Sequence, residues 1–217
     1  MSMLSRLVLL AAVAPWAFAS PLAAQASLGA YGGLNRSVLR GDGPPNTKYR
    51  DRYGSVLGIV ADFPVATDVA ISVQPSFAQR GAGIAFNVEG ERERRDSLDV
   101  RLDYVSIPVL VKIFAGHRRT FVTGGLDVGF LTKATIHDGA NSDDISDLMK
   151  TMDIAAVFGL GVAIVKRQPE ITMELRYAQS FLNVANPESD PETESLPQRF
   201  RSTGLQLLLG ITFTLGR

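Results

Sequence analysis

The chain has 217 residues, and 46% of them are hydrophobic. Its 22 basic and 22 acidic residues give a formal net charge of zero, which offers no reason to expect a nucleic-acid partner. The sequence contains no cysteine, so disulfide bonds and a lipid-modified cysteine behind an export signal are both excluded.

Residues 1–26 have the pattern of a secretory signal peptide. One basic residue precedes the apolar run Leu7–Ala14, and small residues that include Ala24 and Ala26 follow it. A membrane anchor is the alternative, but the run ends at a proline and is much shorter than the roughly 20 apolar residues that a helical span needs. We therefore predict a signal peptide at 1–26, cleaved after Ala26, and a single exported domain at 27–217.

Eight segments of this domain alternate apolar with small or polar residues at every second position, as strands with one apolar face do. Each segment is long enough for a tilted strand to cross a bilayer, which takes about 9–11 residues. We assign the apolar face of each segment to the outside, as with Leu28 and Leu34 in the first. In chain order the segments cover 28–39, 52–63, 68–80, 101–114, 120–132, 152–165, 170–183 and 200–215.

The connections between these segments alternate in length. Short connections are expected at 64–67, 115–119 and 166–169, and long polar ones at 40–51, 81–100, 133–151 and 184–199. Short periplasmic turns and long external loops are typical of outer-membrane barrels. The sequence therefore predicts an all-β fold: an eight-stranded antiparallel up-and-down transmembrane β-barrel with both termini on the periplasmic side.

A period of two does not reveal which face of a strand points outward. An exported soluble lipocalin-like binding barrel also has eight strands, but its outer face must be polar and its apolar face must point inward. This inverted barrel is an alternative, and partition of the protein between buffer and detergent would distinguish the two.

Charged residues also occur on the face that we assign to the lumen. Because the interior of an eight-stranded barrel is only wide enough for side chains, we expect these residues to pair with one another and fill it. Burying any of them without a partner would cost several kcal/mol. A polar channel or a site for a small charged ligand is the alternative. The predicted lumen network consists of Asp62, Lys112, Asp127, Glu174 and Arg176.

One stretch resembles a known family. Tyr104–Lys112, with the sequence YVSIPVLVK, is similar to the Y-L-E-I-P-L-L-L-K stretch of the PorT-like outer-membrane β-barrel domain. Ser106 stands where that family has an acidic residue, so Lys112 has no charged partner at that position. The resemblance covers essentially 27–217 and implies a small barrel in a Gram-negative cell envelope. It implies no activity, because members of the family are mostly uncharacterised. Further stretches that are similar to this family occur in the same order as in the family, at Leu57–Pro64, Val73–Pro75, Thr172–Tyr177 and Gly204–Leu207.

Neither catalysis nor metal binding is predicted. His117 and His137 are expected at opposite ends of the barrel, and neither shares a motif with a serine or a carboxylate that would suit nucleophilic catalysis. The acidic segment around Asp143 and Asp147 lacks the spacing of a calcium loop, so we expect a solvated loop with a short helix at 145–150. No catalytic residue, cofactor or metal ligand is assigned.

The function that the sequence favours is a structural or surface-interaction anchor of the outer membrane, with recognition by the external loops. The alternatives are small-solute passage or ligand binding through the barrel, and the exported soluble binding protein. The expected partners are outer-membrane lipid and lipopolysaccharide, together with periplasmic chaperones and the barrel-insertion machinery. The sequence does not identify an external partner or ligand.

Overall fold

The computed structural model describes residues 26–41, 47–87, 95–116, 118–138, 141–182 and 200–216. Residues 1–25 of the predicted signal peptide and the whole predicted loop 184–199 lie outside this range. Within it, no helix is long and apolar enough to cross a membrane. The elements are β1 (Ser27–Gly41), β2 (Thr47–Arg50), β3 (Arg52–Ala66), β4 (Val69–Val73), β5 (Ser76–Asn87), β6 (Arg95–Ala115), β7 (Thr120–Asp138), β8 (Asn141–Asp144), the 3₁₀ helix η3 (Ser146–Leu148), β9 (Met152–Val165), β10 (Glu170–Ser180) and β11 (Phe200–Thr214).

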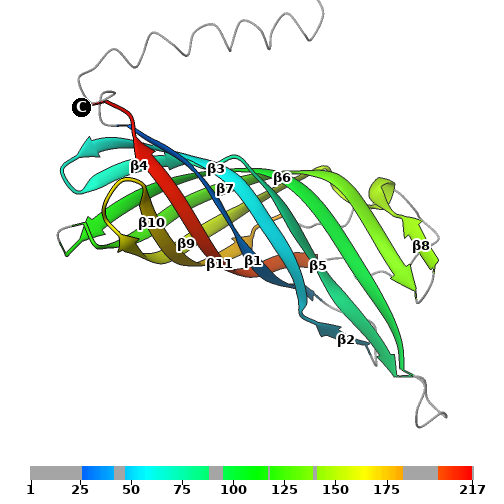
Figure 1. Ribbon diagram of the computed structural model, residues 1–217. Helices are drawn as coiled ribbons and strands as arrows, with labels where there is room; N and C mark the ends of the chain where they lie inside the picture. The colour runs from blue at the N-terminus through cyan, green and yellow to red at the C-terminus, as the bar shows by residue number, and fades with distance from the viewer. Residues whose placement is uncertain are drawn as a thin grey trace, which may run out of the picture.

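The strands form a closed antiparallel ring (Figure 1). β1 pairs with β3 on one side and with β11 on the other, from Ser27 opposite Thr214 to Gly41 opposite Phe200. The ring continues through β4 and β5, β6, β7, β9 and β10. Because β4 and β5 together occupy one position, the described strands make eight crossings. The predicted eight-stranded up-and-down barrel is therefore confirmed.

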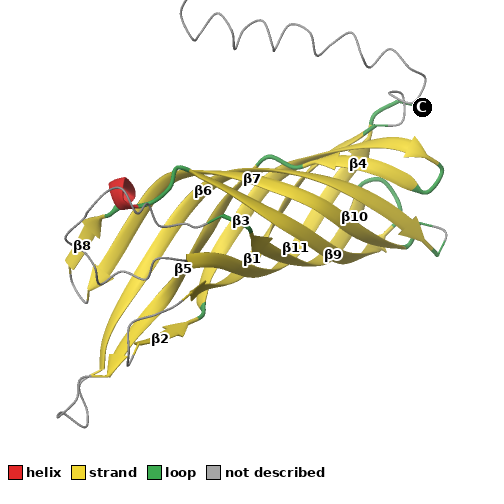
Figure 2. Cartoon of the chain, turned by 180° about the vertical axis from the view of Figure 1, so that it is seen from behind, coloured by secondary structure: helices red, strands yellow, loops and turns green. Residues whose placement is uncertain are grey.

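The two ends of the barrel differ in their connections (Figure 2). At one end, which we call the turn end, short connections join β3 to β4, β6 to β7 and β9 to β10. β1 begins and β11 ends at this same end, since Ser27 lies opposite Thr214. The opposite end, which we call the loop end, carries β2, β8 and η3. This is the arrangement that the alternating connection lengths predict.

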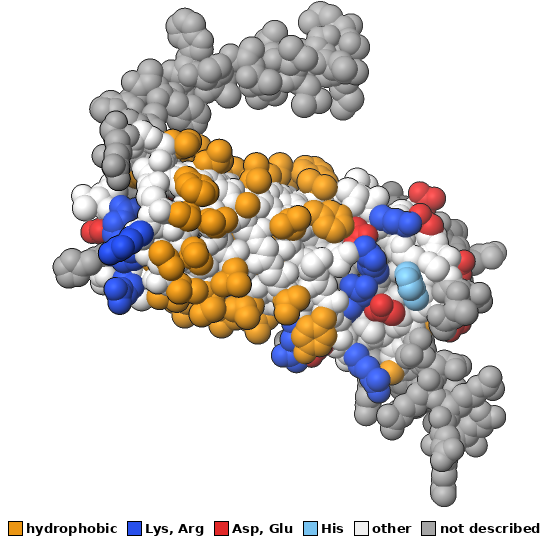
Figure 3. All heavy atoms as spheres, in the orientation of Figure 1, with side chains coloured by type: hydrophobic (Ala, Val, Ile, Leu, Met, Phe, Trp, Pro, Cys, Tyr) orange, Lys and Arg blue, Asp and Glu red, His pale blue; other side chains and the backbone are white. Residues whose placement is uncertain are grey.

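Side chains alternate across the barrel wall. On the outer face, Leu57, Phe158 and Leu160 are 67%, 62% and 66% exposed, whereas their neighbours Val56 and Val157 point inward and are 4% and 2% exposed. On the face that Figure 3 shows, outward apolar side chains form a belt with Lys and Arg side chains at both of its edges. A soluble barrel needs polar residues at these positions. The surface therefore does not favour the lipocalin-like alternative.

A proline divides the predicted segment 68–80 into two strands. Pro75 lacks the N–H group that a central strand donates to its neighbour, so β4 ends at Val73 and β5 begins at Ser76. Hydrogen bonding continues across the break, because the N–H of Gln74 donates to the carbonyl of Pro108 at 2.9 Å. β4 and β5 therefore serve as one interrupted strand of the ring.

At the loop end the strands continue beyond the apolar belt. β6 and β7 contain 21 and 19 residues, about twice the number that a membrane crossing takes. The register shifts at Thr132, and this bulge marks a change in the outer face. On the turn side of the bulge the outer face carries Val105 and Phe130, and on the loop side it carries Asp103 and Lys133.

This extension corrects the predicted loops. Much of 81–100 and 133–151 is strand, because β5, β6 and β7 continue past the belt and β8 pairs back onto β7. The predicted loop 40–51 likewise contains β2, which pairs with β5. The predicted helix at 145–150 is a single 3₁₀ turn, η3. Polar residues above the membrane belt resemble a loop in sequence even where they form strands.

Candidate functional site

The middle of the barrel is enclosed by strands but lined by charged side chains. These side chains come from six strands, and none of the residues is more than 8% exposed. Because an unpaired buried charge costs several kcal/mol, their pairing determines whether the interior is stable. The buried charged residues that point into the lumen in the described part of the chain are Asp62, Arg80, Lys112, Asp127, Asp153, Glu174 and Arg176.

Lys112 and Asp62 form an ion pair in the half of the lumen near the turn end. The Nζ atom of Lys112 donates to Oδ2 of Asp62 at 2.7 Å, and the hydroxyl of Ser72 donates to Oδ1 of Asp62 at 2.5 Å. The amide of Gln74 donates in turn to the Ser72 hydroxyl at 2.8 Å. Both oxygens of the Asp62 carboxylate are therefore satisfied.

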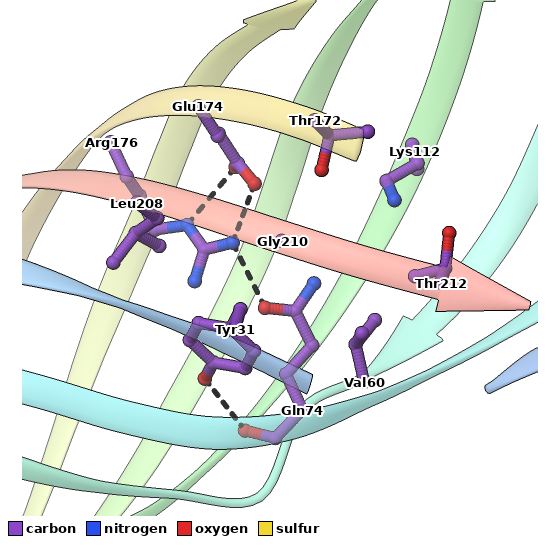
Figure 4. Close-up of a pocket in the computed structure, with 10 residues that line it drawn as sticks. All are labelled: Tyr31, Val60, Gln74, Lys112, Thr172, Glu174, Arg176, Leu208, Gly210 and Thr212. Atoms are coloured by element: carbon purple, nitrogen blue, oxygen red, sulfur yellow. Dashed lines mark hydrogen bonds and ion pairs between the residues drawn. The ribbon is translucent and has the colours of Figure 1, made fainter. Parts of the chain in front are cut away.

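Arg176 and Glu174 form a second pair beside the first (Figure 4). The guanidinium donates to both carboxylate oxygens of Glu174, at 3.0 and 2.8 Å, and to Oε1 of Gln74 at 2.9 Å. The hydroxyl of Thr123 also donates to Glu174, at 2.7 Å, and the hydroxyl of Tyr31 donates to the backbone carbonyl of Gln74 at 3.2 Å. Gln74 thus links the two ion pairs into one network.

Arg80 organises the half of the lumen near the loop end. Its guanidinium donates to Asp127 at 2.5 Å, to Asp153 at 2.9 Å and to the hydroxyl of Ser106 at 3.1 Å. The hydroxyl of Ser180 donates to the other oxygen of Asp153. One arginine therefore serves two buried aspartates that belong to different strands.

Each lumenal cation also lies over an aromatic ring, which adds a favourable electrostatic contact. Glycines in the wall make room for this packing: a Cβ atom at Gly161 would lie 2.1 Å from the Phe121 ring. The interior is therefore filled by ion pairs and by the rings that cover them. The distances to the ring centroids are 4.8 Å for Lys112 over Phe121, 5.0 Å for Arg80 over Tyr104 and 6.0 Å for Arg176 over Tyr31.

Small spaces lie between these side chains. Three cavities along the lumen have volumes of about 20, 10 and 10 Å³. A cavity of roughly 10–15 Å³ holds a single water molecule. Spaces of this size do not accommodate a hydrated solute.

The structure places all five residues of the predicted lumen network inside the barrel. Asp62 pairs with Lys112 and Glu174 pairs with Arg176, but Asp127 pairs with Arg80, which lies outside the predicted set. Asp153 was missed as well. Both missed residues have the inward phase of their strands, so the period-two pattern contained the signal that identifies them.

The extension at the loop end has a small apolar core of its own. Ala82, Val100, Leu102, Tyr104 and Ala134 are buried on its inner face, and Ile145 and Met149 from the segment around η3 pack against them. Backbone bonds fix this segment, since the N–H of Ile145 donates to the carbonyl of Ala134 at 3.0 Å. The predicted solvated loop is thus partly built into the mouth of the barrel.

Exposed acidic side chains, among them Asp143 and Asp144, lie on the outer side of this segment. No group of three or more His, Asp or Glu residues in the described ranges could hold a metal ion. Asp144 accepts hydrogen bonds from the hydroxyl and the N–H of Ser146, at 2.6 and 2.9 Å, and these bonds lower the pKa of Asp144. His137 lies on β7 at the loop end, and His117 lies outside the described residues.

An apolar outer belt, a charged interior and a closed antiparallel ring define a transmembrane β-barrel of the outer-membrane class. The chain belongs to the outer membrane protein beta-barrel domain family, whose sequence pattern matches residues 18–186. Its location is therefore the outer membrane.

Solved structures include similar barrels. The chain is similar to Neisserial surface protein A, with 12% identity, coverage of 87% of this chain and 97% of that chain, and a TM-score of 0.50. It is also similar to Ail, the attachment invasion locus protein of Yersinia pestis, with 14% identity, 87% and 99% coverage and a TM-score of 0.45. At 12% identity the similarity to Neisserial surface protein A shows the fold alone. No curated protein matches the sequence.

Proposed function

We propose that this barrel anchors a recognition surface at the outside of the cell. The observation that carries this proposal is the extension at the loop end, which has a buried core around Leu102 and a polar outer face with Arg101 and Lys133. A strand extension of this kind is a rigid scaffold that continues above the membrane. Binding surfaces are commonly loops carried by such a rigid scaffold.

The proposed orientation can be tested by labelling single cysteines, because the chain has no cysteine of its own. Asp143→Cys on β8 should react with a membrane-impermeant maleimide on intact cells. Arg167→Cys in a connection at the turn end should react only after the outer membrane is opened. Both positions are exposed, so accessibility of the residue itself does not distinguish them. The reverse labelling pattern would contradict the proposed function.

A passage for small solutes is the competing function, and the filled lumen argues against it. Lys112→Met removes the cation that pairs with Asp62, and the methionine side chain is about as large as the lysine side chain. We expect the variant to be less stable, because Asp62 loses its partner, and to show no conductance in planar bilayers. Wild-type protein measured in the same bilayers is the control. New single-channel events in the variant would show that the ion pair closes a pore.

Several finer assignments accompany this proposal. The PorT-like affiliation is supported by Tyr104–Lys112, which lies on β6 within the membrane belt. Lipopolysaccharide would contact the half-buried Arg101 and the exposed Lys133 and Arg201 at the loop-end edge of that belt. Export would require cleavage after Ala26, periplasmic chaperones and the insertion machinery. The proposal assigns neither an enzymatic activity nor a cofactor.

A further inference from the structure

The charges inside the barrel do not balance. Two of the lumenal ion pairs are one to one, Lys112 with Asp62 and Arg176 with Glu174. Arg80 instead faces two carboxylates, Asp127 at 2.5 Å and Asp153 at 2.9 Å. Among the buried charged side chains that point into the described lumen, four are therefore acidic and three are basic. The excess negative charge lies in the half near the loop end.

The same half contains two buried acceptor oxygens without a donor. Asp127 uses Oδ2 to accept from Arg80, but its Oδ1 has no hydrogen-bond partner among the described residues, and its side chain is 6% exposed. The side-chain oxygen of Asn35, a residue that is 1% exposed, is also without a partner there. Leaving a buried acceptor unsatisfied costs about 1–3 kcal/mol, and more when the group is charged. A hydrogen-bond donor or a cation in contact with these two oxygens would remove this cost.

Two of the small cavities adjoin these oxygens. One is lined by Asp127 together with Ser76, Ser106 and Gln206, and the other by Asn35 and Gln206 among others. Each has a volume of about 10 Å³, which is the space for one water molecule or one ion of similar size. Arg176 also lies on the wall of the first cavity, but its charge is already balanced by Glu174.

We propose that the loop-end half of the barrel interior binds one small monovalent metal cation, of the size of Na⁺, against Oδ1 of Asp127. Such an ion supplies the missing positive charge, and protein oxygens can replace its hydration shell. The neutral oxygens of Ser76, Ser106 and Gln206 lie around the same space. A divalent ion does not fit, because it prefers several carboxylates or a retained water shell. A water molecule fits the space but leaves the excess charge uncompensated.

The test is unfolding of the refolded barrel by urea in lipid vesicles, in NaCl and in choline chloride at equal ionic strength. Choline is too large for the cavity, so it controls for screening. Above its dissociation constant, each tenfold rise in Na⁺ should raise the folding equilibrium constant by up to tenfold. Equal stability in both salts at every concentration would overturn the proposal in favour of a water molecule. Stability that depends on pH but not on Na⁺ would overturn it in favour of a bound proton.

Two variants locate the site. Asp127→Asn keeps the size of the side chain and leaves Asp153 to pair with Arg80, so it should lose the Na⁺ dependence. Asp62→Asn removes a lumenal carboxylate from the other half and should keep the Na⁺ dependence, although it lowers overall stability. An Asp127→Asn protein that retains the dependence would overturn the assignment.

A measurement on the wild-type protein covers the case in which Asp127→Asn does not refold. Crystals grown with Tl⁺ in place of Na⁺ should show an anomalous peak in the cavity beside Asp127. Absence of an anomalous peak at that position would overturn the proposal.

Discussion

Replacing Arg80 with methionine is expected to lower the free energy of unfolding by about 3–5 kcal/mol, the cost of leaving buried charges without their partner. Arg80 is the cation that the buried Asp127 and Asp153 share, so this one change removes the ion-pair partner of two carboxylates. It also removes the contact of the guanidinium with the Tyr104 ring. Urea unfolding of the barrel in lipid vesicles measures the difference.

The control for this prediction removes the charges together. A triple variant that combines Arg80→Met with Asp127→Asn and Asp153→Asn removes all three charges of this ion-pair cluster. Since replacing a whole buried ion network is often close to neutral, most of the lost stability should return. If the triple variant is as unstable as Arg80→Met alone, the lost stability comes from packing against Tyr104 and Ser106 and not from the unpaired charges.

The position of each side chain relative to the wall was predictable, because a strand has a strict period of two. Leu28 and Leu34 of β1 are 46% and 62% exposed, whereas Asn35 of the same strand is 1% exposed. Which buried charges pair was not predictable. Asp127 and Arg80 are 47 positions apart, and they meet only because the barrel closes with a particular stagger between strands.

The extent of the strands at the loop end was also missed, for a physical reason. In a membrane crossing most outward residues are apolar, and this makes the alternation visible in the sequence. Above the belt the outward residues of β6 become Asp103 and Arg101, so the outer face no longer differs from a solvated loop. The inward residues still alternate, since Val100 and Leu102 are buried, and this weaker pattern identifies the continued strand.

Replacing Leu209 with arginine tests the membrane belt itself. Leu209 lies near the middle of the apolar face of β11, opposite Gly32 and Met173, and is 55% exposed on the outer surface. An arginine that faces lipid near the bilayer midplane costs about 2–4 kcal/mol, and one near the interface costs about 0–1 kcal/mol. Leu215→Arg, at the turn-end edge of the same face, is therefore the matched control. Urea unfolding in vesicles gives both values.

The dependence on depth distinguishes lipid contact from a general intolerance of β11 to charge. In vesicles of shorter-chain lipid the bilayer is thinner, so an arginine at 209 lies closer to the headgroups and its cost should fall. The cost at 215, already near the interface, should change little. Equal costs at the two positions in both lipids would mean that the apolar belt does not contact the hydrocarbon core, and the membrane-spanning position of β11 would be wrong.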